Sequence, residues 1–214
     1  MTSTTVSLFL LRQSISEMFV TLGDLHDLYG TYYLRTAGTT RTLVSSLHKL
    51  ISTSVAILTL LSLDPAATTT AKLDHNADNY PLAENRGTSL LHGTAVKRGL
   101  VFHGSVPTRN GVDAPPFNHS KAKAITQRAM RFSRDRQWEV YDTEKNLVYA
   151  LSAEVGELCN AVGWGDGAGG NDIEIGPDKI HSIAGETADV IIYSLKLAHV
   201  LGITAKIFAQ ATRP

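Results

Sequence analysis

The chain has 214 residues, of which 43% are hydrophobic, so it is long enough to bury a core. Its 20 basic and 20 acidic side chains cancel, and this balance gives no sign of a nucleic-acid-binding or membrane-binding surface. The single cysteine, Cys159, excludes an intrachain disulfide and is typical of a reducing compartment. We therefore expect a cytoplasmic protein, although the Ser/Thr-rich first residues also allow an organellar transit peptide.

The first half of the chain has patchy periodicity. Apolar patterns at 6–34 and 43–63 allow helices, and the apolar stretch at 50–63 is shorter than the roughly 20 residues that cross a bilayer. Residues 64–118 hold most of the prolines with scattered Gly, Asn and Thr, which predicts loop or disorder. We expect residues 1–118 to be a poorly defined N-terminal extension, mostly irregular with some helices.

The second half is predicted to be all-α. The predicted elements, in chain order, are a helix at 120–138, a helix at 143–164, a glycine-rich loop at 163–172, a helix at 177–202 and a short helix from 204. Asp142 or Thr143 can cap the second helix, Pro177 suits a first turn, and Gly202 suits a helix end. No segment alternates as a half-buried strand does. We therefore expect an all-α domain over 119–214.

Two of the predicted helices carry a pair of carboxylates on or beside the apolar face. Glu154 and Glu157 lie three residues apart, as do Glu186 and Asp189, so the members of each pair point the same way. The intervening loop is long enough to return the chain antiparallel and bring the pairs face to face. Four clustered carboxylates repel one another without a cation, and oxygen ligands select Mg²⁺, with Mn²⁺ as a substitute. The alternative is solvated surface pairs; a di-iron site needs a Glu-x-x-His motif that neither helix has.

These residues resemble the metal signature of a known family. EVGEL at 154–158, followed by ETADVIIY at 186–193, is similar to the all-α NTP pyrophosphohydrolases, the MazG-like superfamily. Within that superfamily, RDRQWEVYDTEKNLVYALSAEVGEL at 134–158 resembles the dCTP pyrophosphatases most closely. The resemblance covers roughly residues 120–210. It implies a MazG-like helical bundle that hydrolyses a (d)NTP, with dCTP as one candidate, to the monophosphate and pyrophosphate, in the service of nucleotide pool sanitation.

The resemblance also implies roles for single residues. It assigns Mg²⁺ binding to Glu154, Glu157, Glu186 and Asp189, and lets Glu157 orient or deprotonate the attacking water. It assigns contacts with the base or ribose to Trp138, Asn146, Trp164 and Tyr193. The plain alternatives are core packing for the tryptophans and a surface amide for the asparagine. Ala129 and Asp142 stand where dCTP-specific relatives place histidines, which leaves the base preference open.

The helix at 177–202 has apolar residues on more than one side, more than a single partner helix would cover. A second copy would bury the surplus, and the resemblance also implies pairing between subunits, so we expect a homodimer or homotetramer with the base pocket near the interface. The expected partner is a nucleoside triphosphate, with no nucleic acid and no membrane. The competing hypothesis is a helical oligomerisation or interaction module with weak or no turnover, which the C-terminal QATRP favours because it differs from the phosphate-contacting tail of relatives.

Overall fold

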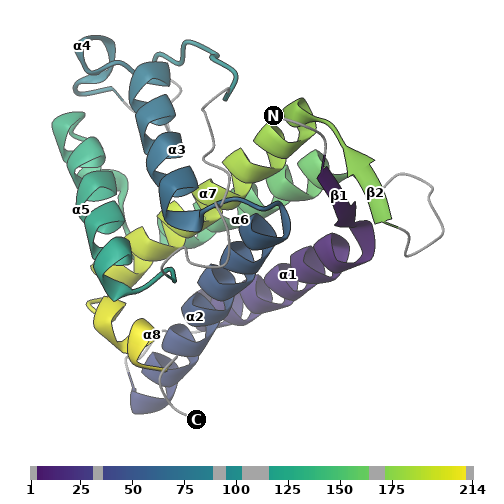
Figure 1. Ribbon diagram of the computed structural model, residues 1–214. Coiled ribbons are helices and arrows are strands. Elements are labelled where there is room, and N and C mark those ends of the chain that lie inside the picture. Colours follow the sequence, from purple (N-terminus) through teal and green to yellow (C-terminus); the bar gives the residue numbers. More distant parts are fainter. Residues whose placement is uncertain (1–3, 31–35, 89–94, 103–115, 164–171, 211–214) are drawn as a thin grey trace.

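The computed structural model describes residues 4–30, 36–88, 95–102, 116–163 and 172–210 (Figure 1). In chain order the elements are β1 (Thr4–Ser7), α1 (Leu8–Gly30), α2 (Ala37–Leu60), α3 (Pro65–Asn79), α4 (Leu82–Asn85), α5 (His119–Asp135), a 3-10 turn (Glu139–Tyr141), α6 (Glu144–Val162), β2 (Asp172–Ile175), α7 (Pro177–Val200) and α8 (Thr204–Gln210). The all-α class is confirmed. One correction is the small antiparallel ribbon, in which Val6 of β1 pairs with Ile173 of β2, because no strand was expected.

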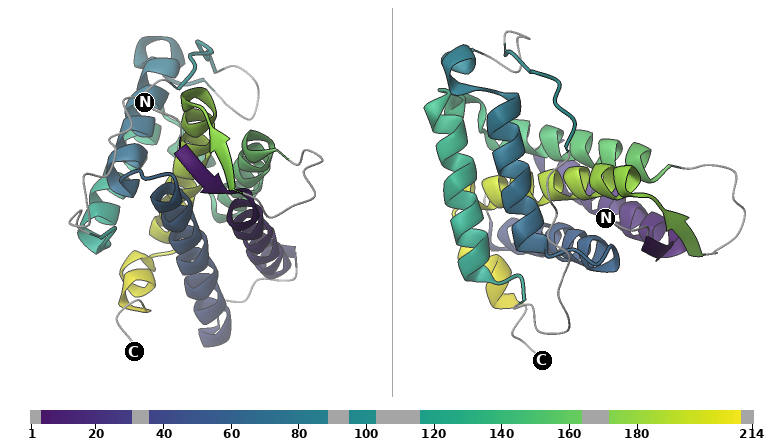
Figure 2. Two further views of the ribbon diagram at one scale, coloured as in Figure 1. Left: turned by 45° about the vertical axis from the view of Figure 1, so that its right-hand side comes forward. Right: turned by 45° about the horizontal axis from the view of Figure 1, so that its top comes forward.

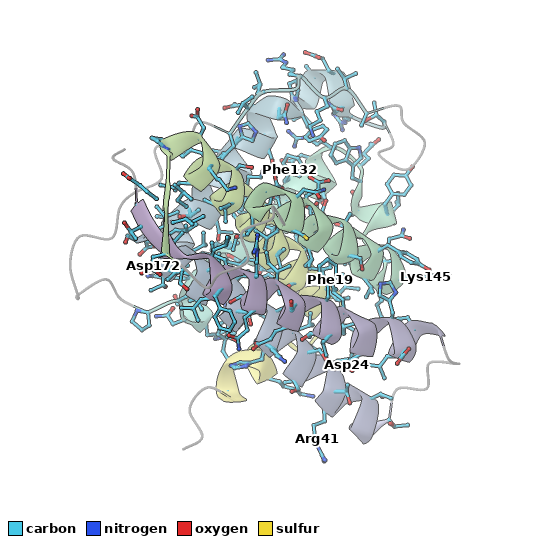
Figure 3. The ribbon with its side chains drawn as sticks, turned by 90° about the vertical axis from the view of Figure 1, so that its right-hand side faces the viewer. Phe19, Asp24, Arg41, Phe132, Lys145 and Asp172 are labelled. Carbon is cyan, nitrogen blue, oxygen red and sulfur yellow. The ribbon has the colours of Figure 1, made fainter. Side chains whose placement is uncertain are left out.

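Four long helices, α1, α2, α6 and α7, form a bundle (Figure 1). Helix α6 packs against α7 and α1, and α2 packs against the same two helices. Helix α1 runs antiparallel to α6, since Arg12 donates to the Gly163 carbonyl while His26, further along α1, lies 2.8 Å from the Ser152 hydroxyl. Figure 3 views the molecule with α1 in front and labels Phe19 and Asp24 on that helix. The N-terminal half thus supplies two of the four bundle helices.

Helix α3 corrects the prediction that residues 64–118 are loop or disorder. It begins with a strong local signal, because the Asp64 carboxylate caps it by accepting from the Ala67 amide at 2.8 Å and Pro65 occupies the first turn. Helices α3 and α5 run parallel and both pack against α7 (Figure 2). The Arg136 Nε of α5's C-terminal cap donates to the Tyr80 carbonyl at 2.8 Å, which ties the two helix ends together.

Helix α7 lies at the centre of the fold. It contacts α2, α3, α5, α6 and α8, and its apolar residues on all sides are almost fully buried, including Ile183, Val190, Ile191, Leu195 and Leu197 at 0% exposure. The surplus apolar surface that predicted a second copy is therefore covered by the chain's own helices. A homo-oligomer stays a prediction that rests on the family resemblance alone.

One stretch of α2, Gly38–Leu60, is long and apolar enough to cross a membrane by length and composition. Half of its most apolar window is buried against the rest of the protein. A core helix passes the same test, so this stretch is weak support for a membrane span.

The division of the chain at residue 118 stays a prediction, although the hydrophobic core is continuous across it and includes Leu11, Leu47, Leu158 and Ile191.

Candidate functional site

Three of the four predicted metal ligands come together between α6 and α7. Glu154, Glu157 and Glu186 each place a carboxylate oxygen within 4.8 Å of the other two. The helices are antiparallel, as expected, because Gly163 at the end of α6 lies near Lys179 at the start of α7 while Asp142, just before α6, contacts Lys196 near the end of α7. The loop prediction at 163–172 falls mostly outside the described residues.

The fourth predicted ligand, Asp189, faces a lysine that the sequence did not point to. The Lys72 Nζ lies 3.0 Å from Asp189 Oδ2, and the Asn76 amide donates to Oδ1 at 3.2 Å. Both partners come from α3, in the segment expected to be irregular. The lysine and aspartate side chains are only 10% and 11% exposed, so the pair is shielded from solvent screening. Helix α3 is thus part of the site.

The gathered acids hold more negative charge than Lys72 compensates. Burial, followed by the charges of Asp189, Glu157 and Glu186, raises the pKa of Glu154 to about 9, although Lys72 opposes the rise. Burial likewise raises the pKa of Glu186. Burial lowers the pKa of Lys72, but attraction to Asp189 and its neighbours outweighs this and raises it above the usual value. The cluster therefore holds extra protons unless another cation enters.

The donor set fits a hard divalent cation. The three convergent groups offer oxygen only, which Mg²⁺ and Mn²⁺ prefer over softer ligands. Burial, followed by the neighbouring carboxylates, raises the pKa of Glu154, and a bound cation would offset both effects by favouring the charged form. Glu154, Glu157 and Glu186 would hold the ion, and Asp189 would join them only by giving up its contact with Lys72.

The acids line a cavity of about 620 Å³, here called the acidic cavity. Positive or protonatable side chains from α3, from α7 and from the segment after α4 line the same cavity. They are Lys72, His75, Lys97 and His181. A cavity lined by both carboxylates and ammonium groups can accept a polyanion and its cation together.

A second cavity of about 230 Å³, the aromatic cavity, adjoins the first. The two share Asn76, Tyr80 and Tyr193 as lining residues. Trp138 and Asn146 line the aromatic cavity, so three of the four residues predicted to contact the base or ribose meet there. The fourth, Trp164, lies outside the described residues.

The aromatic walls are held in place by neighbours. Trp138 is 3% exposed, stands edge-on to Tyr80 and Phe132 at ring-centre distances of 5.6 and 5.7 Å, and donates from Nε1 to the Thr88 hydroxyl at 3.3 Å. The Asn146 amide donates to the Tyr141 carbonyl at 3.0 Å. Trp138 is therefore both a core residue and a wall of the cavity, and its contact with a base stays a prediction.

The sequence contains a signal for helix α3, but the polar composition of residues 64–118 made it easy to miss. Lys72, Asn76 and Tyr80 recur every four residues, and this spacing places them on one helical face. The Asp64–Pro65 pair marks a helix start. The helix is largely polar because one face lines a cavity, and a polar run without a broad apolar stripe is easily taken for loop.

Comparison with known proteins gives a partial match. The chain is 31% identical over 103 residues to dCTP pyrophosphatase 1 of Mus musculus, which covers 44% of this chain and 58% of the relative. It is 32% identical over 88 residues to dCTP pyrophosphatase 1 of Rattus norvegicus, covering 40% and 52%. No family model and no solved structure matches.

Part of this chain is similar to dCTP pyrophosphatase 1. The chain spans about half the length of the curated relatives it matches. Because the match is partial, the activity, the substrate and the metal of this chain are matters for proposal.

Proposed function

We propose that this protein is a Mg²⁺-dependent nucleoside triphosphate pyrophosphohydrolase, which cleaves a (d)NTP to the monophosphate and pyrophosphate. The observation that carries the proposal is the junction of the two cavities at Tyr193, with carboxylates on one side and aromatic rings on the other. A nucleotide has the same two-part character, with a charged phosphate chain and a flat base. The similarity to dCTP pyrophosphatase 1 supports the same reaction class.

Glu154, Glu157 and Glu186 are the proposed ligands of Mg²⁺, with Asp189 as the fourth. When bound, the ion supplies neutralising charge to the triphosphate and polarises the phosphorus under attack. Without it, the carboxylates would repel the phosphates, because the cluster and the substrate are both anionic. The carboxylates therefore bind and place the ion, while the rest of the cavity wall orients the phosphate chain.

Lys72 and Lys97 are the proposed phosphate contacts of the chain itself. Lys72 uses its ammonium on Asp189, and an ammonium has three donors, so it can also reach a phosphate oxygen. The Lys97 Nζ lines the same cavity and lies 5.9 Å from the centre of the ring of Tyr80, a residue that both cavities share. Both residues come from the half of the chain that had no predicted role.

Glu157 is the proposed group that orients or deprotonates the attacking water. It is the exposed member of the three gathered glutamates, so a water can reach it from the cavity. The more buried Glu154, whose pKa lies at about 9, holds its own proton near neutral pH in the metal-free cluster. A general base must be within hydrogen-bond reach of the water and ionised when it acts.

The aromatic cavity is the proposed base site. Trp138, Tyr80 and Tyr193 offer ring faces and edges to a flat base, and stacking of this kind is worth about 1–3 kcal/mol per base in other nucleotide sites. Trp138 also keeps water away from the junction, because its ring is buried among Tyr80 and Phe132.

Pyrophosphate release over a panel of deoxy- and ribonucleoside triphosphates tests the proposal. We expect Mg²⁺-dependent release by the wild type, and loss of release in Glu157→Gln with helicity unchanged. The matched control is Asp24→Asn, which removes the same charge from the exposed face of α1, away from both cavities (Figure 3). Near-normal turnover in Glu157→Gln would contradict the assignment.

The second candidate is an interaction module that keeps the fold with weak or no turnover. The Lys72–Asp189 contact favours it, because a lysine already neutralises one of the four predicted ligands. The same panel of nucleoside triphosphates distinguishes the two hypotheses, since an interaction module would release no pyrophosphate from any nucleotide, with or without Mg²⁺.

A further inference from the structure

Asp142 is a buried acid of the aromatic cavity with one unsatisfied oxygen. It follows the 3-10 turn and immediately precedes the Thr143 cap of α6, and its side chain is 10% exposed. Its Oδ1 lies 2.8 Å from the Lys196 ammonium. Its Oδ2 is shielded from bulk water and has no hydrogen-bond partner among the described residues. An orphaned buried acceptor of this kind destabilises the fold, and a donor on a bound ligand would satisfy it.

The partner of Asp142 fixes the orientation of the carboxylate. Lys196, on α7, is 7% exposed and donates from Nζ to the Ser133 hydroxyl of α5 at 2.9 Å. These two contacts employ two of the three donors of an ammonium. Because Lys196 is anchored to both α5 and the segment before α6, it holds Oδ1 and leaves Oδ2 as the acceptor of the pair. Asp142 and Lys196 both line the aromatic cavity.

The pair presents an acceptor beside a donor in a cavity with aromatic walls. A base that lies against Trp138 would bring its hydrogen-bonding edge to these groups. Cytosine and adenine carry an exocyclic amino donor next to a ring-nitrogen acceptor, which complements a carboxylate oxygen next to an ammonium. Uracil and thymine place a carbonyl oxygen where the amino group would be, and two oxygens facing each other without a proton between them repel.

We propose that Asp142, oriented by Lys196 and Ser133, selects nucleotides whose base carries an amino group at C4 of a pyrimidine or C6 of a purine, which are cytosine and adenine, against bases with a carbonyl oxygen at that position. This inference rests on the proposed function, because it assigns the base of that substrate. It makes Asp142 the specificity-determining residue and Lys196 both its positioning partner and the donor to the ring nitrogen. The base then satisfies the oxygen that the protein leaves without a partner.

Asp142→Asn provides the sharpest test, since it keeps the size of the side chain. Lys196 still donates to the remaining oxygen, so the amide NH₂ takes the place of Oδ2 and turns an acceptor into a donor. The variant should therefore reject the amino group and accept a carbonyl. We expect the ratio of kcat/KM for dCTP over dUTP to fall on the order of 10- to 100-fold, and that for dATP over dITP to fall likewise.

The control variant is Glu139→Gln, which removes an exposed charge three residues away and lines neither cavity. Its ratios should equal those of the wild type. Unchanged ratios in folded Asp142→Asn would overturn the inference. If that variant does not fold, the wild type can be tested with the 2-pyrimidinone deoxynucleotide, which lacks the amino group of dCTP. Use of both at the same kcat/KM would overturn the inference, and a loss of about tenfold or more would support it.

Binding separates this inference from the proposed function. Wild-type protein that releases no pyrophosphate from any nucleotide would contradict the function. Calorimetry with the α,β-methylene analogues of dCTP and dUTP would still test the base site. Tighter binding of the dCTP analogue, reversed or abolished in Asp142→Asn, supports the selection by Asp142, and equal affinities or no binding of either analogue contradict it.

Discussion

The two cavities are built around the same kind of contact, a buried lysine beside a buried aspartate, but their charge balance differs. In the acidic cavity Lys72 meets Asp189 while three glutamates gather nearby, so negative charge is in excess. In the aromatic cavity Lys196 meets Asp142 alone, so charge is balanced and one oxygen lacks a partner. The first arrangement attracts a cation, and the second attracts a neutral hydrogen-bond donor. Similar contacts therefore prepare the two ends of the site for different chemical groups.

The largest expected effect comes from removing α1–α3. A fragment of residues 119–214 lacks Lys72 and Asn76 and exposes the faces of α6 and α7 that the N-terminal helices cover. Apolar faces of that size are not stable in water, so we expect the fragment to self-associate or unfold. Light scattering and circular dichroism measure this outcome. A folded, fully active fragment would instead establish the separate domain that the sequence predicted.

The next effect concerns the excess charge of the acidic cavity. Glu186→Gln replaces one of three converging carboxylates, the one that α7 contributes, with a neutral amide. We therefore expect pyrophosphate release to fall by at least about 100-fold, more than is typical when a group that only orients a metal ligand is changed. The same change should leave the binding of a nucleoside without phosphates unaffected, because that ligand would occupy only the aromatic cavity. Equal losses of pyrophosphate release and of nucleoside binding would show that the two cavities do not bind separate parts of the substrate.

Replacing Lys72 and Lys196 separately should affect different properties, which are Mn²⁺ affinity for the first and base discrimination for the second. Lys72→Met frees Asp189 and removes a competing cation, so Mn²⁺ should bind about tenfold more tightly while the affinity for triphosphate falls. Lys196→Met should leave Mn²⁺ affinity unchanged and weaken base discrimination. Electron paramagnetic resonance titrations of Mn²⁺ measure the first effect. If Lys196→Met shifts Mn²⁺ affinity as much as Lys72→Met does, the two pairs are not independent.

The smallest expected effect is the pH dependence of the free energy of unfolding. The folded pKa of Glu154, about 9, exceeds its usual value of 4.5, so the folded state keeps a proton that the unfolded chain releases. The free energy of unfolding of the metal-free protein should therefore fall as pH rises between these two values. Glu154→Gln should remove this dependence and raise Tm in EDTA at pH 8, by roughly 2–4 °C for each kcal/mol gained.

Added Mg²⁺ provides the control for that experiment. It should raise the Tm of the wild type at pH 8 but not that of Glu154→Gln, because the ion replaces the proton at the cluster. The order of the two Tm values should then reverse between EDTA and Mg²⁺. A wild-type Tm in EDTA that does not change between pH 5 and pH 8 would show that burial and the neighbouring carboxylates do not raise the pKa of Glu154.

The sequence predicted what depends on helical periodicity and missed what depends on contacts between distant segments. The spacing of Glu154, Glu157 and Glu186 on amphipathic helices was sufficient to predict their convergence, because an antiparallel pair of helices has few alternatives. Lys72 is 117 positions from Asp189, and nothing in either local sequence links them. The polar face of α3 concealed a helix for the same reason, since the surface that it faces belongs to other elements.

The role of Asp142 also depends on the three-dimensional structure. As a sequence position it was a candidate N-cap and a departure from the histidine of dCTP-specific relatives, and Thr143 is the N-cap in the structure. Its pairing with Lys196 joins residues 54 positions apart, and the unsatisfied oxygen is visible only once the packing is known. Residues that compensate or orient a charge are therefore the part of this site that required coordinates.

The most direct test of the central claim is ³¹P NMR of wild-type protein incubated with a triphosphate and Mg²⁺, with dCTP as the first substrate. If the acidic cavity holds the triphosphate with its cation and the aromatic cavity holds the base, equal amounts of nucleoside monophosphate and pyrophosphate should appear, and EDTA should stop their formation. Diphosphate with inorganic phosphate, or no product from any amino-bearing or oxo-bearing nucleotide, would contradict the account.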